Sequence, residues 1–301
     1  MKPNAILLAG PTASGKSAKA LELAETYDGV IINADSMQVY PLLNVLTARP
    51  SVDDLIQVEH RLYGHAQLEK PYSVATWLAD AQAAAHTVWQ AGKVPVFVGG
   101  TGLYFRALDH GLANTPSIDP NLRASVRADL INHGSDALHA RLAKLDPKGS
   151  ATLRPSDGQR IARALEVVMQ TGTPLSHFQN RRAQDADRPL LLDLEVQRFL
   201  IMPERADLHA RINNRAELML QSGALEEVEA LVKLDLPSEA TVLRAIGVSQ
   251  LSDLLAGRCS REEALDRLKA ATRQYAKRQS TWFRGQLDDR WKVLFTKQAM
   301  A

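Results

Sequence analysis

Near the start of the chain, Gly10 is followed five residues later by Gly15 and then directly by Lys16 and Ser17. This G-x-x-x-x-G-K-[ST] spacing lets successive backbone N–H groups turn inward and cradle phosphate oxygens. The lysine supplies a positive charge for the terminal phosphates, and the serine hydroxyl can hold Mg²⁺. The pattern predicts a site for a diphosphate or triphosphate, and taken alone it favours a nucleotide, ATP first. The whole loop is Gly10, Pro11, Thr12, Ala13, Ser14, Gly15, Lys16 and Ser17.

Two other polar residues follow apolar runs that are typical of buried strands. Asp35 comes directly after the run at 30–34, and Thr101 follows the run at 94–98 and two glycines. In open α/β sheets, active groups gather at the carboxyl ends of the strands. Asp35 is therefore expected beside the phosphate loop, although a capping or turn-forming role is the alternative. Glycines around Thr101 allow a ligand to approach closely, but a plain tight turn also fits them.

Basic side chains recur on three segments with helical spacing. Apolar residues at 161, 164, 165 and 168 define one helix face, which leaves Gln159 and Arg163 on the opposite face and Arg160 on its flank. Arg211 and Arg215 stand four residues apart, so they share a face and could clamp a diphosphate. The segment 268–285 combines an apolar stripe with a basic one, a plausible rail for phosphate groups. In each case a solvated helix face is the competing interpretation.

The elements that would carry these groups alternate between apolar runs and helical patterns. We expect strands at 6–9, 30–34 and 94–98, a helix at 74–91, an irregular segment at 41–75, and an extended return at 190–202. A strand–helix–strand opening predicts an α/β fold with a parallel sheet. The predicted architecture is a phosphate-loop (P-loop) sheet core flanked by helices, with a helical insertion and C-terminal helices. We assign residues 1–112 and 189–301 to the core and 113–188 to the insertion.

Composition restricts the class of protein. With 301 residues, the chain can bury a substantial core without covalent staples. The net charge of +2 means that any footprint for nucleic acid must be local. Cys259 is the single cysteine, which excludes a disulfide framework and a cysteine metal cluster. The first apolar run is too short for a signal peptide and no run reaches membrane-spanning length, so we expect a cytoplasmic protein without membrane contact.

Five motifs in order form a specific set across the range 6–284. Together they resemble the tRNA dimethylallyltransferase family, also called tRNA isopentenyltransferase. Any one of them is modest support, but five at matching intervals point to one family. The motifs are the phosphate loop at 10–17, Asp-Ser-x-Gln-Val-Tyr at 35–40, Gly-Gly-Thr-Gly-Leu-Tyr at 99–104, Asp-x-Gln-Arg-x-x-Arg-Ala-Leu-Glu at 157–166, and Tyr-Ala-Lys-Arg-Gln-x-Thr-Trp-Phe-Arg at 275–284.

This resemblance implies transfer of a dimethylallyl group from dimethylallyl diphosphate to the exocyclic amine of the adenosine 3′-adjacent to the anticodon. The implied catalytic residues are Asp35, as the base, and Thr101. The diphosphate would lie on the phosphate loop with Arg211 or Arg215, and Ser17 would hold Mg²⁺. A bacterial-type monomer that binds the anticodon stem-loop is expected. The implied tRNA-binding residues are Asp35, Ser36, Met37, Gln38, Thr101, Arg123, Gln159, Arg160, Ile161, Ala162, Arg163, Lys277 and Arg278.

The chain departs from the family pattern at three places, and two other classes remain open. The departures lie at 46–50, at 58–63 and at Val248; they put surrounding contacts in doubt but not the reaction class. A small-molecule or nucleoside kinase would share the phosphate loop and Asp35, but would not need the glycine-rich turn together with the basic C-terminal stripe. A nucleotide-gated RNA-binding protein would need the arginine-bearing helices but not Asp35 and Thr101.

Overall fold

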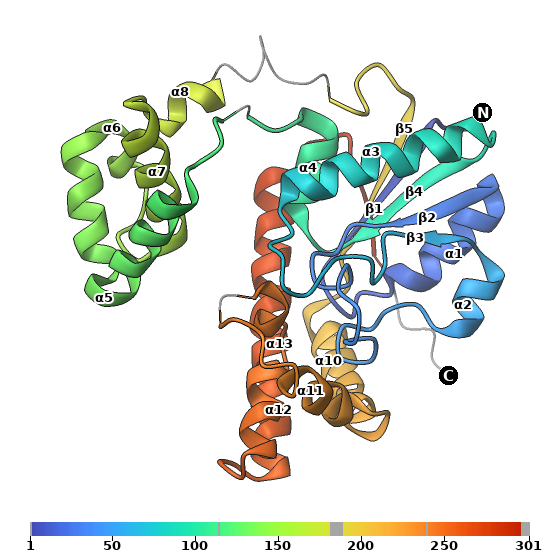
Figure 1. The fold of residues 1–301 in the computed structure, drawn as a ribbon. Coiled ribbons are helices and arrows are strands. Elements are labelled where there is room, and N and C mark those ends of the chain that lie inside the picture. Colours follow the sequence, from blue (N-terminus) through green and yellow to red (C-terminus); the bar gives the residue numbers. More distant parts are fainter. Residues whose placement is uncertain (1, 114, 181–188, 239, 296–301) are drawn as a thin grey trace. The chain divides into compact units, whose positions relative to one another are not determined.

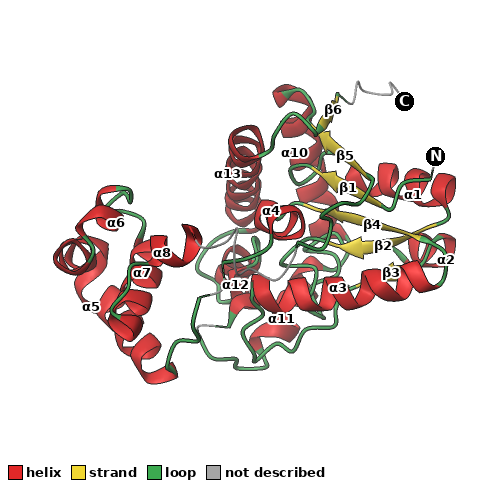
Figure 2. Cartoon of the chain, turned by 90° about the horizontal axis from the view of Figure 1, so that it is seen from above, coloured by secondary structure: helices red, strands yellow, loops and turns green. Residues whose placement is uncertain are grey.

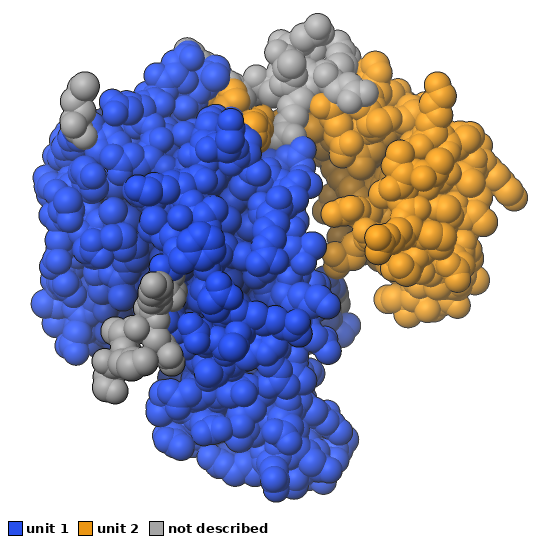
Figure 3. All heavy atoms as spheres, turned by 180° about the vertical axis from the view of Figure 1, so that it is seen from behind, with its two compact units in different colours: residues 1–109, 190–301 blue, residues 110–189 orange. Residues whose placement is uncertain are grey.

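The computed structural model, drawn in Figure 1, describes residues 2–113, 115–180, 189–238 and 240–295. The chain divides into two compact units, coloured separately in Figure 3. Unit 1 comprises Met1–Asp109 and Leu190–Ala301, and unit 2 is His110–Pro189. The sequence predicts unit boundaries after residues 112 and 188. In the structure the first boundary lies three residues earlier and the second lies one residue later.

A parallel sheet organises unit 1. Among the described residues its order is β3-β2-β4-β1-β5-β6, and each neighbouring pair is parallel (Figure 2). Because β4 lies between β1 and β2, the carboxyl ends of these three strands are neighbours, and this edge positions the site. The strands are β1 (Ala5–Ala9), β2 (Gly29–Asn33), β3 (His60–Arg61), β4 (Val94–Gly99), β5 (Val196–Ile201) and β6 (Lys292–Leu294).

Helices cover both faces of the sheet, which explains why its central strands are apolar throughout. In β1, Ile6 and Leu8 pack toward α1, whereas Leu7 belongs to the larger core on the other face. There Trp77 stacks on Tyr104 with ring centroids 3.9 Å apart. The helices of unit 1 are α1 (Lys16–Tyr27), α2 (Val52–Gln57), α3 (Val74–Gln90), α4 (Gly102–His110), α10 (Arg205–Gln221), α11 (Ala224–Val232), η1 (Thr241–Arg244), α12 (Val248–Leu255) and α13 (Arg261–Gln286).

A nearly buried ion pair joins α4 to β5. Arg198 Nη2 lies 2.6 Å from Asp109 Oδ1, and the two side chains are 9% and 5% exposed. Removing one partner of such a pair leaves the other charge buried and uncompensated, which costs about 3–5 kcal/mol. We therefore expect Arg198→Met to lower the free energy of unfolding by about 3 kcal/mol in a denaturant titration.

Arg290 provides the matched control for this prediction. Its Nη2 atom lies 3.9 Å from the same carboxylate, but its side chain is 46% exposed. Arg290→Met should therefore cost no more than about 1 kcal/mol. An equal loss of stability in the two variants would contradict the assigned role of burial.

Unit 2 is entirely helical among its described residues and has its own apolar core. Buried residues of α5 and α7, including Val126, Leu142, Ile161 and Leu165, form this core. Asp119 accepts hydrogen bonds from the backbone N–H groups of 121 and 122 and so caps the start of α5. The helices are α5 (Pro120–Leu145), α6 (Pro147–Ala151), α7 (Gly158–Thr171) and α8 (Leu175–Asn180).

Three predictions from the sequence need correction. The segment 41–75 is not irregular throughout, because it contains α2, β3 and the start of α3. In the tail, where the sequence offers only the short apolar segment Val293-Leu294-Phe295, the structure adds an edge strand, β6. The apolar stripe expected on α13 is buried only in part. Leu268 is buried, whereas Ala271, Tyr275 and Trp282 are half-buried, and the buried face continues through Ala276, Gln279 and Phe283. None of the helices in the described ranges is long and apolar enough to cross a membrane.

Candidate active site

The structure brings the phosphate loop, Asp35 and Thr101 together at the carboxyl ends of β1, β2 and β4. The backbone N–H of Thr101 donates to the Ala34 carbonyl at 3.2 Å, and the Ser36 N–H donates to Thr101 Oγ1 at 2.9 Å. These two bonds connect the turn after β2 to the turn after β4. An added Cβ at Gly99 would lie 2.0 Å from the Ala34 carbonyl oxygen, so only glycine permits this close approach.

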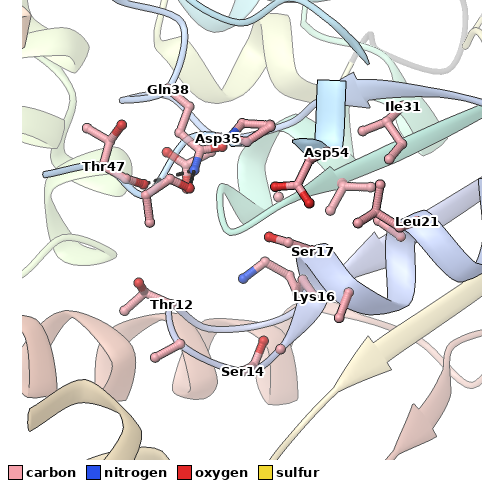
Figure 4. A pocket seen from close by; sticks show the side chains of 18 of the residues that line it. Thr12, Ser14, Lys16, Ser17, Leu21, Ile31, Asp35, Gln38, Thr47 and Asp54 are labelled. Atoms are coloured by element: carbon pink, nitrogen blue, oxygen red, sulfur yellow. Dashed lines mark hydrogen bonds between the residues drawn. The ribbon is translucent and has the colours of Figure 1, made fainter. Parts of the chain in front are cut away.

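The phosphate loop forms a cradle at the N-terminus of α1. Ala13 and Gly15 have φ angles of 62° and 90°, a left-handed geometry that turns backbone N–H groups toward a common point. Lys16 Nζ donates to the Pro11 carbonyl at 2.7 Å and extends into the pocket drawn in Figure 4. Ser14 Oγ is buried and lacks a hydrogen-bond partner in the described structure. The loop thus has the shape and charge for phosphate oxygens.

Helix α10 adds two arginines to this cradle. Arg211 Nη1 donates to the Ser14 carbonyl at 3.4 Å, and Arg215 Nη2 donates to Thr12 Oγ1. Both side chains line the same cavity as Lys16. Burial lowers the pKa of Lys16 to about 8, an effect that Asp35 opposes and Arg215 reinforces. A pocket with several positive groups and a desolvated lysine is prepared for a multiply charged anion.

Asp35 is oriented by its own turn. Its backbone N–H donates to Asn33 Oδ1 at 2.8 Å, and its Oδ1 accepts from the Met37 N–H at 2.9 Å. Among the described residues, none donates a hydrogen bond to Oδ2, so this oxygen is available to a substrate. Burial raises the pKa values of Tyr63 and Tyr275, and Asp35 raises them further, so both phenols stay protonated at neutral pH.

Two cavities meet at Asp35. The first, of about 330 Å³, contains the phosphate loop, Lys16 and both arginines of α10. The second, of about 270 Å³, has a mostly apolar wall from α10 and α13 with Tyr275 and Arg278. Four residues line both cavities: Thr12, Asp35, Thr47 and Arg215. One carboxylate thus borders a phosphate cradle on one side and an apolar chamber on the other.

The residues expected to contact tRNA separate into three groups. Ser36, Met37 and Arg278 line the second cavity, and Gln38 lines the first while its Nε2 donates to the Thr47 and Ala48 carbonyls. Lys277 lies exposed on α13. The third group, in unit 2, is Arg123, Gln159, Arg160, Ile161, Ala162 and Arg163.

In unit 2 a buried glutamate gathers the arginines. Glu166, with a side chain 4% exposed, lies 3.3 Å from Arg163, 3.7 Å from Arg127 and 3.9 Å from Arg123. Three guanidinium groups around one carboxylate leave a net positive surface suited to phosphates. Ile161 and Ala162 are 0% and 5% exposed and pack in the helical core, so their side chains are not available to RNA.

Sequence reasoning missed several residues that line the site. Asp54, Tyr63 and Arg244 border the cavities, but they come from the segment expected to be irregular and from a 3-10 turn without periodicity. Arg49, in the departure at 46–50, packs against Gly64; burial lowers its pKa, while Tyr63 and Glu227 raise it. A signal existed for Asp54, because Ser-x-x-Asp at 51–54 is a capping box.

Fold and site together define a P-loop α/β protein with a second chamber beside its phosphate cradle. The family model described as IPP transferase matches residues 38–286, and one described as isopentenyl transferase matches residues 3–70. The chain belongs to the IPP transferase family and is a transferase.

Known relatives agree along nearly the whole chain. A tRNA dimethylallyltransferase of Rhizobium johnstonii is 53% identical, with 97% of each chain covered. A tRNA dimethylallyltransferase of Agrobacterium fabrum is 52% identical, and the match covers 96% of this chain and 95% of that protein. A solved tRNA isopentenylpyrophosphate transferase of Bacillus halodurans superimposes with a TM-score of 0.68 at 31% identity, covering 98% of this chain and 90% of that one. A solved structure of a eukaryotic dimethylallyltransferase acting on tRNA superimposes with a TM-score of 0.78 at 25% identity. The match covers 97% of this chain and 73% of that one.

Proposed function

We propose that the protein transfers a dimethylallyl group from dimethylallyl diphosphate to the exocyclic amine of the adenosine 3′-adjacent to the anticodon of tRNA. The observation that carries this proposal is the position of Asp35 between a phosphate cradle and an apolar chamber. The donor's diphosphate and the acceptor base can then approach the same carboxylate from two sides. Family membership supports the choice of substrates, because the curated relatives carry that activity in their names.

In the first cavity the protein stabilises the leaving diphosphate. As the bond between the allylic carbon and oxygen breaks, negative charge grows on the diphosphate, where Lys16, Arg211 and Arg215 are already placed. Ser17 and Asp54 line this cavity, and their oxygens are ligands that Mg²⁺ accepts (Figure 4). Mg²⁺ bound there would neutralise part of the diphosphate charge. No cluster of three His, Cys, Asp or Glu residues exists within the described ranges, so water and phosphate oxygens would complete its shell.

In the second cavity the protein receives the acceptor. A base inside an RNA stem-loop must leave its stack to reach an enclosed carbon centre. The chamber offers Met37, Ile212, Leu268 and Tyr275 as apolar contacts for such a base. As the amine nitrogen attacks the allylic carbon, its surplus proton passes to Asp35, with Thr101 holding the adjoining turn through Ser36.

We expect Arg163→Ala to weaken tRNA binding about 5- to 10-fold and to reduce the salt dependence of binding by about one phosphate contact. The reason is that Arg163 belongs to the positive cluster around Glu166 and is also fixed by Thr115 at 2.9 Å. A filter-binding series over several salt concentrations measures both quantities. Arg141→Ala is the control, because Arg141 pairs with Asp129 at 2.9 Å and does not belong to the cluster around Glu166. An unchanged salt slope for the Arg163 variant would show that this helix face is solvated and does not contact the phosphates of tRNA.

The reaction itself is tested with purified protein, unmodified tRNA and dimethylallyl diphosphate labelled in its carbon chain. Parallel reactions contain γ-labelled ATP with a nucleoside. Label in tRNA that depends on both substrates supports the proposal. Label transferred from ATP to the nucleoside, with none in tRNA, would overturn it in favour of a kinase.

A further inference from the structure

One buried amide of α13 contacts both loops that hold the reacting groups. Gln279 is 6% exposed, although it is a polar residue in the middle of a helix. Its Oε1 accepts from the Thr12 N–H of the phosphate loop at 2.9 Å, and its Nε2 donates to the Gly100 carbonyl at 2.9 Å. Only one orientation of the amide satisfies both partners, since Thr12 N is a donor and Gly100 O an acceptor.

The surrounding packing shows that this contact is tight. A Cβ added at Gly100 would lie 2.3 Å from Gln279 Nε2, and one added at Gly102 would lie 2.1 Å from the ring of Trp282. The glycine-rich turn after β4 therefore lies directly against α13. Gln279 and Trp282, which lie on one turn of α13, thus pack against the glycines on the two sides of Thr101.

We propose that Gln279 is a positioning residue that sets the spacing between the diphosphate cradle and the turn carrying Thr101. The phosphate loop carries the leaving group. In the 99–102 turn, Thr101 Oγ1 accepts a hydrogen bond from the Ser36 N–H and so holds the residue that follows Asp35. Gln279 is the hydrogen-bonded link between these two loops. Its side chain lines neither of the two cavities, so it acts through Thr12 and Gly100. This inference rests on the proposed transfer reaction.

The geometry predicts a defect in rate rather than in affinity for tRNA. Without the link, the two loops adopt a wider range of separations, and a misplacement of about 1 Å can cost up to about 100-fold in rate. Gln279→Met keeps the length and volume of the side chain but makes neither hydrogen bond. Gln279→Glu keeps an oxygen for the Thr12 N–H but replaces the donor to Gly100.

The experiment measures single-turnover transfer at saturating donor, the dissociation constant for tRNA and the midpoint of thermal unfolding. We expect Gln279→Met to lower the rate about 10- to 100-fold with tRNA affinity within twofold of wild type. At neutral pH Gln279→Glu should be slowed at least as much as Gln279→Met, because its buried carboxylate keeps the Thr12 bond but turns an acceptor oxygen toward the Gly100 carbonyl. Gln274→Met, the same substitution at an exposed position of the same helix, should behave as wild type.

The possible results separate this inference from the proposed function. If the wild-type protein does not label tRNA at all, the proposed function fails. If the wild type transfers and folded Gln279→Met keeps the wild-type rate, the positioning role alone is overturned. A lower unfolding temperature with an unchanged rate would also overturn it, since that result describes a structural residue. If Gln279→Met does not fold, Gln279→Glu decides: a wild-type rate there overturns the role of the Gly100 bond.

Discussion

Asp35→Asn is expected to lower the single-turnover rate of transfer by about 100- to 10,000-fold, the range attributed to a positioned general base. The amide keeps an oxygen for the Met37 N–H, so the turn is retained while the basic oxygen is lost. Affinity for tRNA should change little, because the basic residues of unit 2 and α13, where we propose the phosphate contacts, are untouched. Rapid-quench measurement with labelled donor gives the rate, and filter binding gives the affinity.

Asp53→Asn is the matched control for the loss of one carboxylate near the site. Asp53 precedes the cavity-lining Asp54 on α2 but is itself exposed. Its variant should transfer at the wild-type rate. An Asp35→Asn protein that retains the wild-type rate would remove Asp35 from the role of base, whatever its position between the two cavities.

Lys16→Met is expected to weaken binding of inorganic diphosphate about 100-fold and to reduce transfer by a similar factor. Lys16 is a cation in the phosphate cradle, and its pKa is lowered to about 8 by burial. A lysine with this pKa is charged below pH 8 and loses its charge as the pH rises through 8. Diphosphate affinity of the wild-type protein should therefore fall more steeply above pH 8 than below it, which calorimetric titration at several pH values measures.

Lys16→Arg separates this effect from ionisation of the ligand. An arginine side chain stays charged across the whole range. The Lys16→Arg protein should bind diphosphate more weakly than wild type at neutral pH, because the guanidinium group fits the loop less well than an ammonium group. Its affinity should change less with pH above pH 8. If the wild-type and Lys16→Arg curves bend equally, the pH dependence belongs to the ligand and not to Lys16.

The sheet core and the parts of the site at strand ends could be predicted from the sequence. Buried strands are apolar runs bounded by glycine, and a residue that directly follows such a run must lie at the edge of the sheet. The phosphate loop, Asp35 and Thr101 do lie at the strand ends, where the structure brings them together. The shared face of Arg211 and Arg215 also followed from helical spacing, and both line the first cavity.

Other features depend on tertiary contacts that leave no periodic signal. β3 has two residues and β6 has three, too short for an alternating pattern, and both exist because a neighbouring strand offers backbone partners. Gln279 is a polar residue of α13, and helical spacing does not identify its partners, which lie 267 and 179 residues away along the chain. The burial of Glu166 likewise reflects three arginines from two helices rather than any local pattern.

The place where the chain leaves unit 1 has a further consequence. The Leu191 N–H donates to the Leu108 carbonyl at 3.4 Å, so the chain departs and returns at points that unit 1 already holds together. The chain between Leu108 and Leu191 is therefore a loop whose ends are held together by unit 1. The entropy cost of closing such a loop grows only slowly with the number of residues inserted in it. The helical unit, with a core of its own, can vary in length and sequence at little cost to the sheet. The tRNA contacts that we propose for this unit can thereby vary while the residues at the strand ends stay the same.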